Sequence, residues 1–123
     1  MRALTLSRGL PGKIMTLRPK ATIDEIREAL TPVLQKGGAS RAIVFGSHAS
    51  GEADDHSDLD IVIVAETTHT FFDRYKDFDD IYELWRGGLD MLIYTPGELA
   101  EMVEEGRAFI ERVLDTGVVI YEK

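Results

Sequence analysis

The fold is decided by two neighbouring stretches, Phe45-Gly46-Ser47-His48-Ala49-Ser50-Gly51 and Ser57-Asp58-Leu59-Asp60-Ile61-Val62-Ile63-Val64. The apolar run 42–45 ends at the Gly-Ser pair. The second apolar run, 61–64, has two carboxylates at its start. Alternate side chains of a strand share a face, so Asp58 and Asp60 point together with Cα atoms about 6.6 Å apart. Such a pair can hold divalent cations, and backbone N–H groups of the Gly-Ser turn can contact a phosphate. The stretch therefore predicts a nucleotide-metal site.

Length and composition describe one ordinary globular domain. The 123 residues are enough to bury roughly two thirds of the surface that the unfolded chain exposes. A net charge of −8 argues against stable binding of duplex nucleic acid, whose affinity comes mainly from neutralised phosphates. A small nucleotide accompanied by Mg²⁺ is compatible with that charge. The absence of cysteine excludes disulfides, thiolate catalysis and Cys-ligated zinc.

The sequence contains no signal for a membrane or for export. No run of about 18 apolar residues occurs, and residues 1–17 lack the apolar centre of a signal peptide. These features predict a cytoplasmic protein that does not bind a membrane. We expect residues 1–19 to form a mobile arm or an edge strand through 14–17, and residues 20–123 to form the domain. A further hypothesis is that Met15 is the physiological start of the chain.

Apolar periodicity predicts an α/β (α+β) fold, a small mixed sheet of three to five strands with helices packed on it. Thr22 and Glu25 form a capping-box pattern at the start of a helix that ends near Gly37, and Pro32 is expected to kink it or end its regular part. Ser47 is expected to cap a short helical turn. The aromatic stripe from Phe71 to Trp85 is interpreted mainly as core. Strands are expected at 41–45, 59–65, 89–94 and 118–121, and helices at 71–85, 98–104 and 108–116.

Three known phosphate or metal motifs are absent. Gly46 and Gly51 have the glycine spacing of a P-loop, but Glu52-Ala53 stands where that loop needs Lys-Ser/Thr. No Gly-x-Gly-x-x-Gly occurs, which removes support for a dinucleotide fold. The acidic cluster from Glu52 to Asp60 lacks the glycine and glutamate of an EF-hand loop.

The two aspartates have a simpler interpretation as caps at the end of a strand. Against it, Asp60 directly precedes four apolar residues, where an unpaired charge is costly. A Gly-Ser turn ends another apolar strand about ten residues upstream. A third acid, Asp90, opens the next apolar strand. Together these features favour a site.

The motif Gly46-Ser47, Ala49, Gly51 and Ser57-Asp58-x-Asp60 resembles the signature of the DNA-polymerase-β-like nucleotidyltransferase superfamily. Asp90 within Leu89–Pro96 is similar to the third aspartate of its minimal nucleotidyltransferase (MNT) branch. The resemblance extends from about residue 22 to residue 121. In one departure, Ser50 stands where the family usually has arginine.

This resemblance implies a metal-dependent transfer of a nucleotide. Asp58 and Asp60 would hold two Mg²⁺ ions, and Asp90 would ligate one of them beside the attacking hydroxyl. Gly46, Ser47 and Ser57 would bind the nucleotide. Two metals can stabilise both the incoming and the departing oxygen of a phosphoryl displacement. The expected reaction moves NMP, with AMP from ATP as the leading choice, to a hydroxyl and releases pyrophosphate.

The resemblance also implies a partner, because MNT proteins often act as the antitoxin of a HEPN toxin in a toxin–antitoxin pair. The acceptor would then be a tyrosine of that partner. Two alternatives stay open: a non-catalytic module that neutralises its partner by contact, favoured by Ser50, and a kanamycin-type transferase acting on a small-molecule hydroxyl. A homodimer is compatible with a small sheet whose edges need cover.

Several other polar residues are weaker candidates for contacts with a phosphate. His48 is expected on an exposed helix face, although it could touch a phosphate. Arg74, Lys76 and Arg86 could replace the missing arginine, although solvated helix faces often carry such residues.

Overall fold

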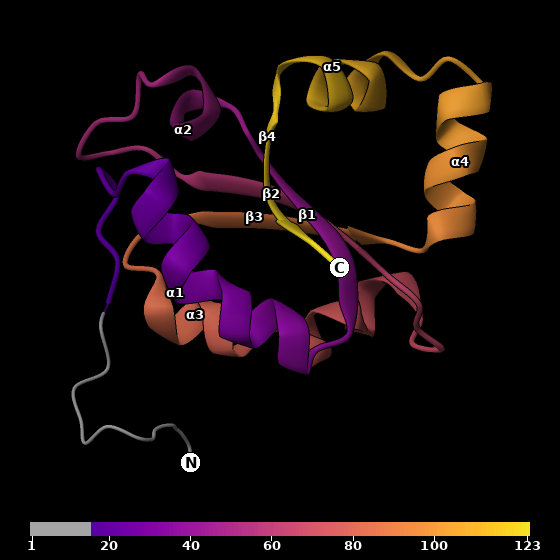
Figure 1. Cartoon of the computed structure of the whole chain (residues 1–123), viewed down its shortest axis with the longest axis horizontal. Coiled ribbons are helices and arrows are strands. Elements are labelled where there is room, and N and C mark those ends of the chain that lie inside the picture. The colour runs from indigo at the N-terminus through magenta and orange to yellow at the C-terminus, as the bar shows by residue number, and fades with distance from the viewer. Residues whose placement is uncertain (1–15) are drawn as a thin grey trace.

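The computed structural model describes residues 16–123, so most of the expected arm, including Ile14 and Met15, lies outside the described residues. Figure 1 labels the elements. In chain order they are α1 (Ile23–Lys36), β1 (Ala39–Phe45), α2 (Ser47–Ser50), β2 (Leu59–Ala65), the 3₁₀ helix η1 (Phe71–Asp77), α3 (Asp80–Leu84), β3 (Leu89–Tyr94), α4 (Pro96–Glu104), α5 (Ala108–Thr116) and β4 (Val118–Glu122). None of the described helices is long and apolar enough to cross a membrane.

The strands form one mixed sheet in the order β3-β2-β1-β4, which confirms the expected fold class. β1 runs antiparallel to β2 and β4, whereas β2 and β3 are parallel. Phe45 at the end of β1 lies opposite Asp60, and Asp60 lies opposite Asp90. The end of β1 and the beginnings of β2 and β3 therefore meet at one end of the sheet.

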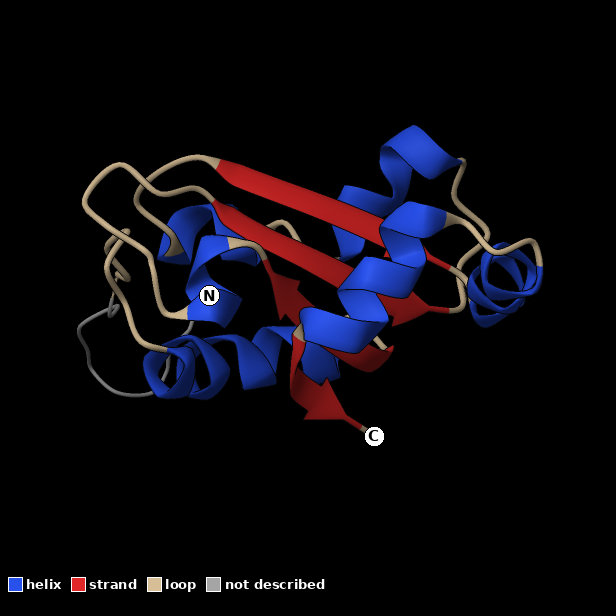
Figure 2. Cartoon of the chain, turned by 90° about the horizontal axis from the view of Figure 1, so that it is seen from above, coloured by secondary structure: helices blue, strands red, loops and turns tan. Residues whose placement is uncertain are grey.

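Helices cover both faces of this sheet, as the view in Figure 2 shows. On one face, α1 and α3 contribute residues such as Leu30 and Ile81 to a core with Ile61 and Ile63 of β2. On the other face, the residues Ile110 and Val113 of α5 pack against Ile43 and Val62. This double cover explains why β2 is a continuous apolar run without alternation.

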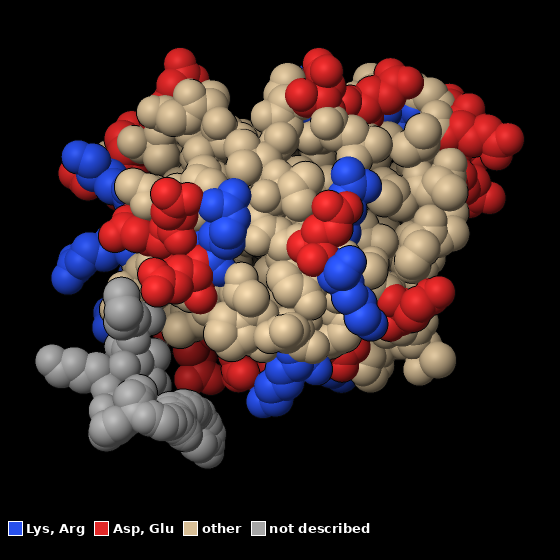
Figure 3. Space-filling view, viewed as in Figure 1, with Lys and Arg blue, Asp and Glu red and all other residues tan. Residues whose placement is uncertain are grey.

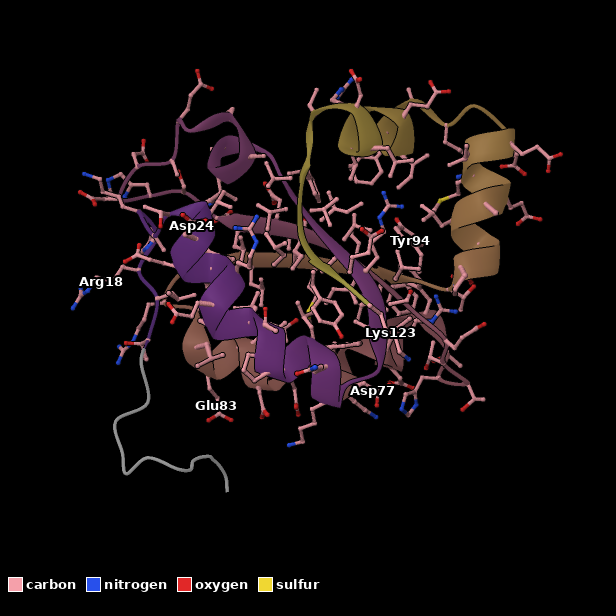
Figure 4. The ribbon with its side chains drawn as sticks, viewed as in Figure 1. Arg18, Asp24, Asp77, Glu83, Tyr94 and Lys123 are labelled. Carbon is pink, nitrogen blue, oxygen red and sulfur yellow. The ribbon has the colours of Figure 1, made fainter. Side chains whose placement is uncertain are left out.

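Tyr94 ends β3 on the second face, where it lies between the sheet and α4 (Figure 4). Burial raises the pKa of Tyr94, and the negative charges of Asp90 and Glu98 raise it further.

Thr95 and Glu98 form a capping box that begins α4 at Pro96, two residues earlier than expected. The turn after β3 is therefore fixed by local hydrogen bonds.

The first helix begins as predicted. Thr22 accepts a hydrogen bond from the Glu25 amide, and the Glu25 carboxylate accepts one from the Thr22 amide. The expectation that Pro32 ends the regular part is wrong, because α1 continues through Pro32 to Lys36. Leu30 and Leu34 are fully buried on either side of Pro32, so packing against the sheet stabilises the helix across the proline.

The predicted single helix from 71 to 85 is wrong. The chain forms η1 and α3, separated at Phe78, whose φ of −132° and ψ of 21° are not helical. This break changes the helical phase, so the aromatic residues cannot share one face. The buried apolar residues of this segment are Phe78, Ile81 and Trp85, whereas Phe71, Phe72, Tyr75 and Tyr82 are 42–86% exposed.

Residues at the beginning of the described chain pack into the fold. Leu17 is 5% exposed and forms an isolated parallel bridge with Trp85. Its amide donates to the Leu84 carbonyl, and its carbonyl accepts from the Arg86 amide. Within the described residues, the expected edge strand is reduced to this single bridge.

Candidate active site

The three predicted aspartates lie at the same end of the sheet. Asp60 is the second residue of β2, and its Cα partner in β3 is Asp90. Asp58 precedes β2 by one residue. Asp60 is partly buried, whereas Asp58 and Asp90 are exposed. Because side chains of a strand alternate, Asp60 points to the same face as Val62, the face that α5 covers.

Two glycines leave the space that the carboxylates occupy. A Cβ at Gly46 would lie 2.5 Å from Oδ2 of Asp60, and one at Gly88 would overlap Oδ1 of Asp58. Each carboxylate is therefore seated against a glycine backbone. Gly46 belongs to the predicted motif. The role of Gly88 was missed, although the Gly87-Gly88 pair before β3 is a sequence signal for close backbone approach.

The charges of the three acids influence one another. Burial raises the pKa of Asp60, and the negative charges of Asp90 and Asp58 raise it further, whereas His48 has the opposite effect. A bound cation would relieve this repulsion, and carboxylate oxygens are the ligands that Mg²⁺ prefers. Within residues 16–123, however, no three His, Asp or Glu side chains are close enough to form a metal-binding group. The donor chemistry fits Mg²⁺, and its binding would have to draw the carboxylates together.

The Gly-Ser turn joins β1 to α2 directly beside Asp60, at the end of the sheet where β2 begins (Figure 1). The amides of Ala49 and Ser50 both donate to the Gly46 carbonyl, at 3.1 Å. Gly46 is thus the N-cap, and the expectation that Ser47 takes this position is wrong. Since the first amides of a helix have no partner within it, the amide of Ser47 is available to an external acceptor.

Two serines of the motif are engaged locally. The Ser50 hydroxyl is 3.2 Å from both the Ser47 carbonyl and the Glu52 carboxylate. A carboxylate therefore lies next to the position where the resemblance predicts an arginine. The Ser57 hydroxyl accepts from the Asp54 amide at 2.8 Å and donates to Oδ1 of Asp54 at 3.2 Å. It stabilises the loop that leads to Asp58.

Arg74, proposed above as a substitute cation, does not serve the site. It is 7% exposed and bonds both oxygens of Glu98, at 2.6 and 3.0 Å, and the Ile93 carbonyl. Ile93 is near the opposite end of β3 from Asp90. Lys76 pairs with Asp73 in η1 at 3.5 Å. Arg86 is exposed beside the Gly87-Gly88 turn and stays a candidate.

His48 also differs from expectation, because the structure buries it. Its exposed fraction is 5%, and its ring packs against Trp85 with centroids 5.2 Å apart. Trp85 in turn donates from Nε1 to the Gly88 carbonyl. A four-residue helix gives no periodicity from which this burial could be predicted.

The sequence of the chain is similar to those of known proteins. The family described as polymerase beta nucleotidyltransferase matches residues 28–123, which is most of the chain. The chain belongs to this family. A protein of Methanocaldococcus jannaschii named as a protein adenylyltransferase is 32% identical over 73 residues, covering 59% of this chain and 78% of its own.

Solved nucleotidyltransferase structures are similar as well. A structure described as a minimal nucleotidyltransferase has a TM-score of 0.57 at 27% identity and covers 80% of this chain and 95% of its own. A structure from Sulfolobus solfataricus described as a nucleotidyltransferase has a similar fold, with a TM-score of 0.54 at 23% identity; the match covers 83% of this chain and 81% of that one. The resemblance to the minimal branch predicted from the sequence is thus confirmed.

Proposed function

We propose that this nucleotidyltransferase moves NMP, and specifically AMP from ATP, to a hydroxyl in a Mg²⁺-dependent reaction. The observation that carries the proposal is the register that sets Phe45 opposite Asp60 and Asp60 opposite Asp90. It brings a turn suited to phosphate and a group of carboxylates to one end of the sheet. The relative named as a protein adenylyltransferase supports AMP as the transferred group and a protein as the acceptor.

Each residue has a role in this proposal. The backbone of Gly46 and Ser47, with the Ser47 hydroxyl, binds the triphosphate. Asp58, Asp60 and Asp90 hold two Mg²⁺ ions, which when bound supply electrostatic stabilisation to the phosphoryl oxygens. The exposed Asp90 orients the acceptor hydroxyl and accepts its proton. Ser57 acts indirectly, through the loop that sets the position of Asp58.

The acceptor we propose is a tyrosine of a HEPN-type partner. The described residues form one sheet with its covering helices and contain no second domain to present an acceptor. The exposed carboxylates Asp58 and Asp90 leave the site open to an incoming chain. A protein acceptor also agrees with the name of the relative.

The decisive experiment is a calorimetric titration with ATP, with and without Mg²⁺, combined with an assay of pyrophosphate release. We expect binding that depends on Mg²⁺ and a Kd that rises at least tenfold in Asp58→Asn/Asp60→Asn. Asp55→Asn is the matched control, since Asp55 is an exposed acid of the same loop. Equal binding by the double variant would contradict the proposed site.

One observation favours a second function, a non-catalytic module that neutralises its partner by contact. The Ser50 hydroxyl lies 3.2 Å from the Glu52 carboxylate, so negative charge is found where a phosphate-binding cation is expected. The double aspartate variant separates the two functions. If it still neutralises the partner and leaves it unmodified, contact alone is sufficient.

A further inference from the structure

His48 is held by contacts on two sides. Its Nε2 is hydrogen-bonded to the carbonyl of Pro19 in the segment that precedes α1. Its ring meets Trp85 edge to face, with an interplanar angle of 79°. The side chain is 5% exposed, although it belongs to the short helix directly after the Gly-Ser turn.

These contacts determine which nitrogen of the imidazole carries a hydrogen. A carbonyl oxygen only accepts hydrogen bonds, so Nε2 carries the hydrogen. Nδ1 is buried and has no hydrogen-bond partner among residues 16–123. The imidazole therefore acts as a donor toward Pro19 and as a packing surface toward Trp85.

The same contacts continue to the carboxylates. Trp85 donates from Nε1 to the Gly88 carbonyl at 2.9 Å, and that carbonyl also accepts from the Leu59 amide. The α-carbon of Gly88 lies against the Asp58 carboxylate. A continuous chain of contacts thus runs from His48 through Trp85 and Gly88 to Asp58.

We propose that His48 is a positioning residue of the nucleotide site. It fixes the Gly46-Ser47 turn relative to Asp58 by tying α2 to the Pro19 carbonyl and to Trp85. The inference rests on the proposed function, because the turn and the aspartate are assigned there to triphosphate and Mg²⁺. Without the Pro19 hydrogen bond, α2 keeps its place in the chain but loses a fixed orientation toward the carboxylates.

The test compares His48→Phe, which keeps a ring against Trp85 but loses the hydrogen bond, with His48→Gln, which keeps a side-chain N–H. His69→Phe is the matched control, since His69 lies in the loop after β2, where its ring is 3.6 Å from Asp77. Thermal unfolding and the emission of Trp85, the only tryptophan, report whether each variant is folded. Amide hydrogen exchange at residues 46–51 and the Kd for ATP with Mg²⁺ report positioning.

We expect folded His48→Phe to exchange faster at residues 46–51 than wild type, with unchanged exchange in β1 and β2. Its Kd should rise roughly five- to tenfold, the effect of one hydrogen bond. His48→Gln should have an exchange rate at residues 46–51 and a Kd between those of His48→Phe and wild type. His69→Phe should match wild type in both measurements. Wild-type exchange and affinity in His48→Phe would overturn the inference, as would faster exchange throughout the core.

The proposed function and the positioning role can fail separately. If wild-type protein binds no ATP, the proposed function is wrong, and exchange at residues 46–51 alone decides whether His48 orders the turn. If His48→Phe does not fold, the milder His48→Gln decides by the same measurements: wild-type exchange and Kd would overturn the role, and intermediate values would support it.

Discussion

At the scale of single residues, Gly46 has the most restricted position in the site. Its φ of +76° is unfavourable for other residues, and a Cβ there would lie 2.5 Å from the Asp60 carboxylate. We expect Gly46→Ala to lower the free energy of unfolding by about 1–3 kcal/mol and to abolish ATP binding. Gly38→Ala is the control, because Gly38 has a φ of +81° but open space around it. Denaturant unfolding should show the smaller loss for Gly38→Ala, with ATP binding intact; equal effects would contradict the role of the carboxylate contact.

Asp60 is a second residue with a functional role to be inferred, because its ionised carboxylate lowers the stability of the folded state. Its pKa is raised above the ordinary 3.8 by burial and by Asp90 and Asp58. Between the ordinary and the raised value, the folded state binds more protons than the unfolded state, so stability falls as the pH rises through this window. We expect Asp60→Asn to be more stable than wild type at pH 7 by a few degrees in Tm, with a smaller difference below the ordinary pKa. Asp55→Asn serves as the control; a lower Tm for Asp60→Asn at pH 7 would show that Asp60 is stabilising instead.

At the scale of elements, Arg74 and Glu98 join η1 to the N-terminus of α4. The buried guanidinium bonds both carboxylate oxygens and the Ile93 carbonyl. Removing the carboxylate leaves a buried charge unpaired, so we expect Glu98→Ala to lower the free energy of unfolding by about 1–3 kcal/mol. Glu101→Ala, on an exposed turn of the same helix, should have a much smaller effect in denaturant unfolding. Comparable losses would mean that the ion pair contributes little.

The same pair predicts a pH dependence. Hydrogen bonds from Arg74 and from the Thr95 amide lower the pKa of Glu98 in the folded protein. The stability that this carboxylate contributes is therefore present above its unfolded pKa of about 4.5 and is lost as the pH falls through the lower folded value. Between pH 7 and pH 3 we expect Tm to fall more in wild type than in Glu98→Gln. Parallel curves would contradict this linkage.

Elements with a local signal could be predicted from the sequence. β2 and β3 have the expected limits because short apolar runs bounded by turn residues define a strand. The segment from 71 to 85 could not be predicted, because Phe78 breaks it where its side chain enters the core, and Arg74 is buried against Glu98, far along the chain. The neighbouring positions of Asp60 and Asp90 were foreseen because each opens a core strand.

Other parts of the site depend on tertiary contacts that no local pattern contains. His48 is buried by Pro19 and Trp85, which come from segments distant in the sequence. Gly88 supports Asp58 only because the parallel pairing of β2 and β3 brings the two turns together. Aspartates and the Gly-Ser turn could thus be read from the chain, whereas the residues that hold them in place required the structure.

At the scale of the whole molecule, acidic charge dominates the surface. Figure 3 shows Asp and Glu gathered over α4 and α5, the helices on the face toward which Asp60 points. With a net charge of −8, non-specific cation binding would stabilise the protein to some extent through screening. A specific site would add stability by mass action, about 2.7 kcal/mol when the ligand is at 100 times its Kd.

We therefore expect Mg²⁺ with ATP to raise Tm by several degrees in wild type, whereas K⁺ at the same ionic strength should have a much smaller effect. The Asp58→Asn/Asp60→Asn variant should begin from a higher Tm, because repulsion among the acids is relieved, and should gain little from Mg²⁺ and ATP. This opposite change in basal Tm and in ligand response distinguishes a metal site from a generally acidic surface. Equal gains in wild type and variant would assign the cation effect to net charge and would leave the three aspartates without a metal-binding role.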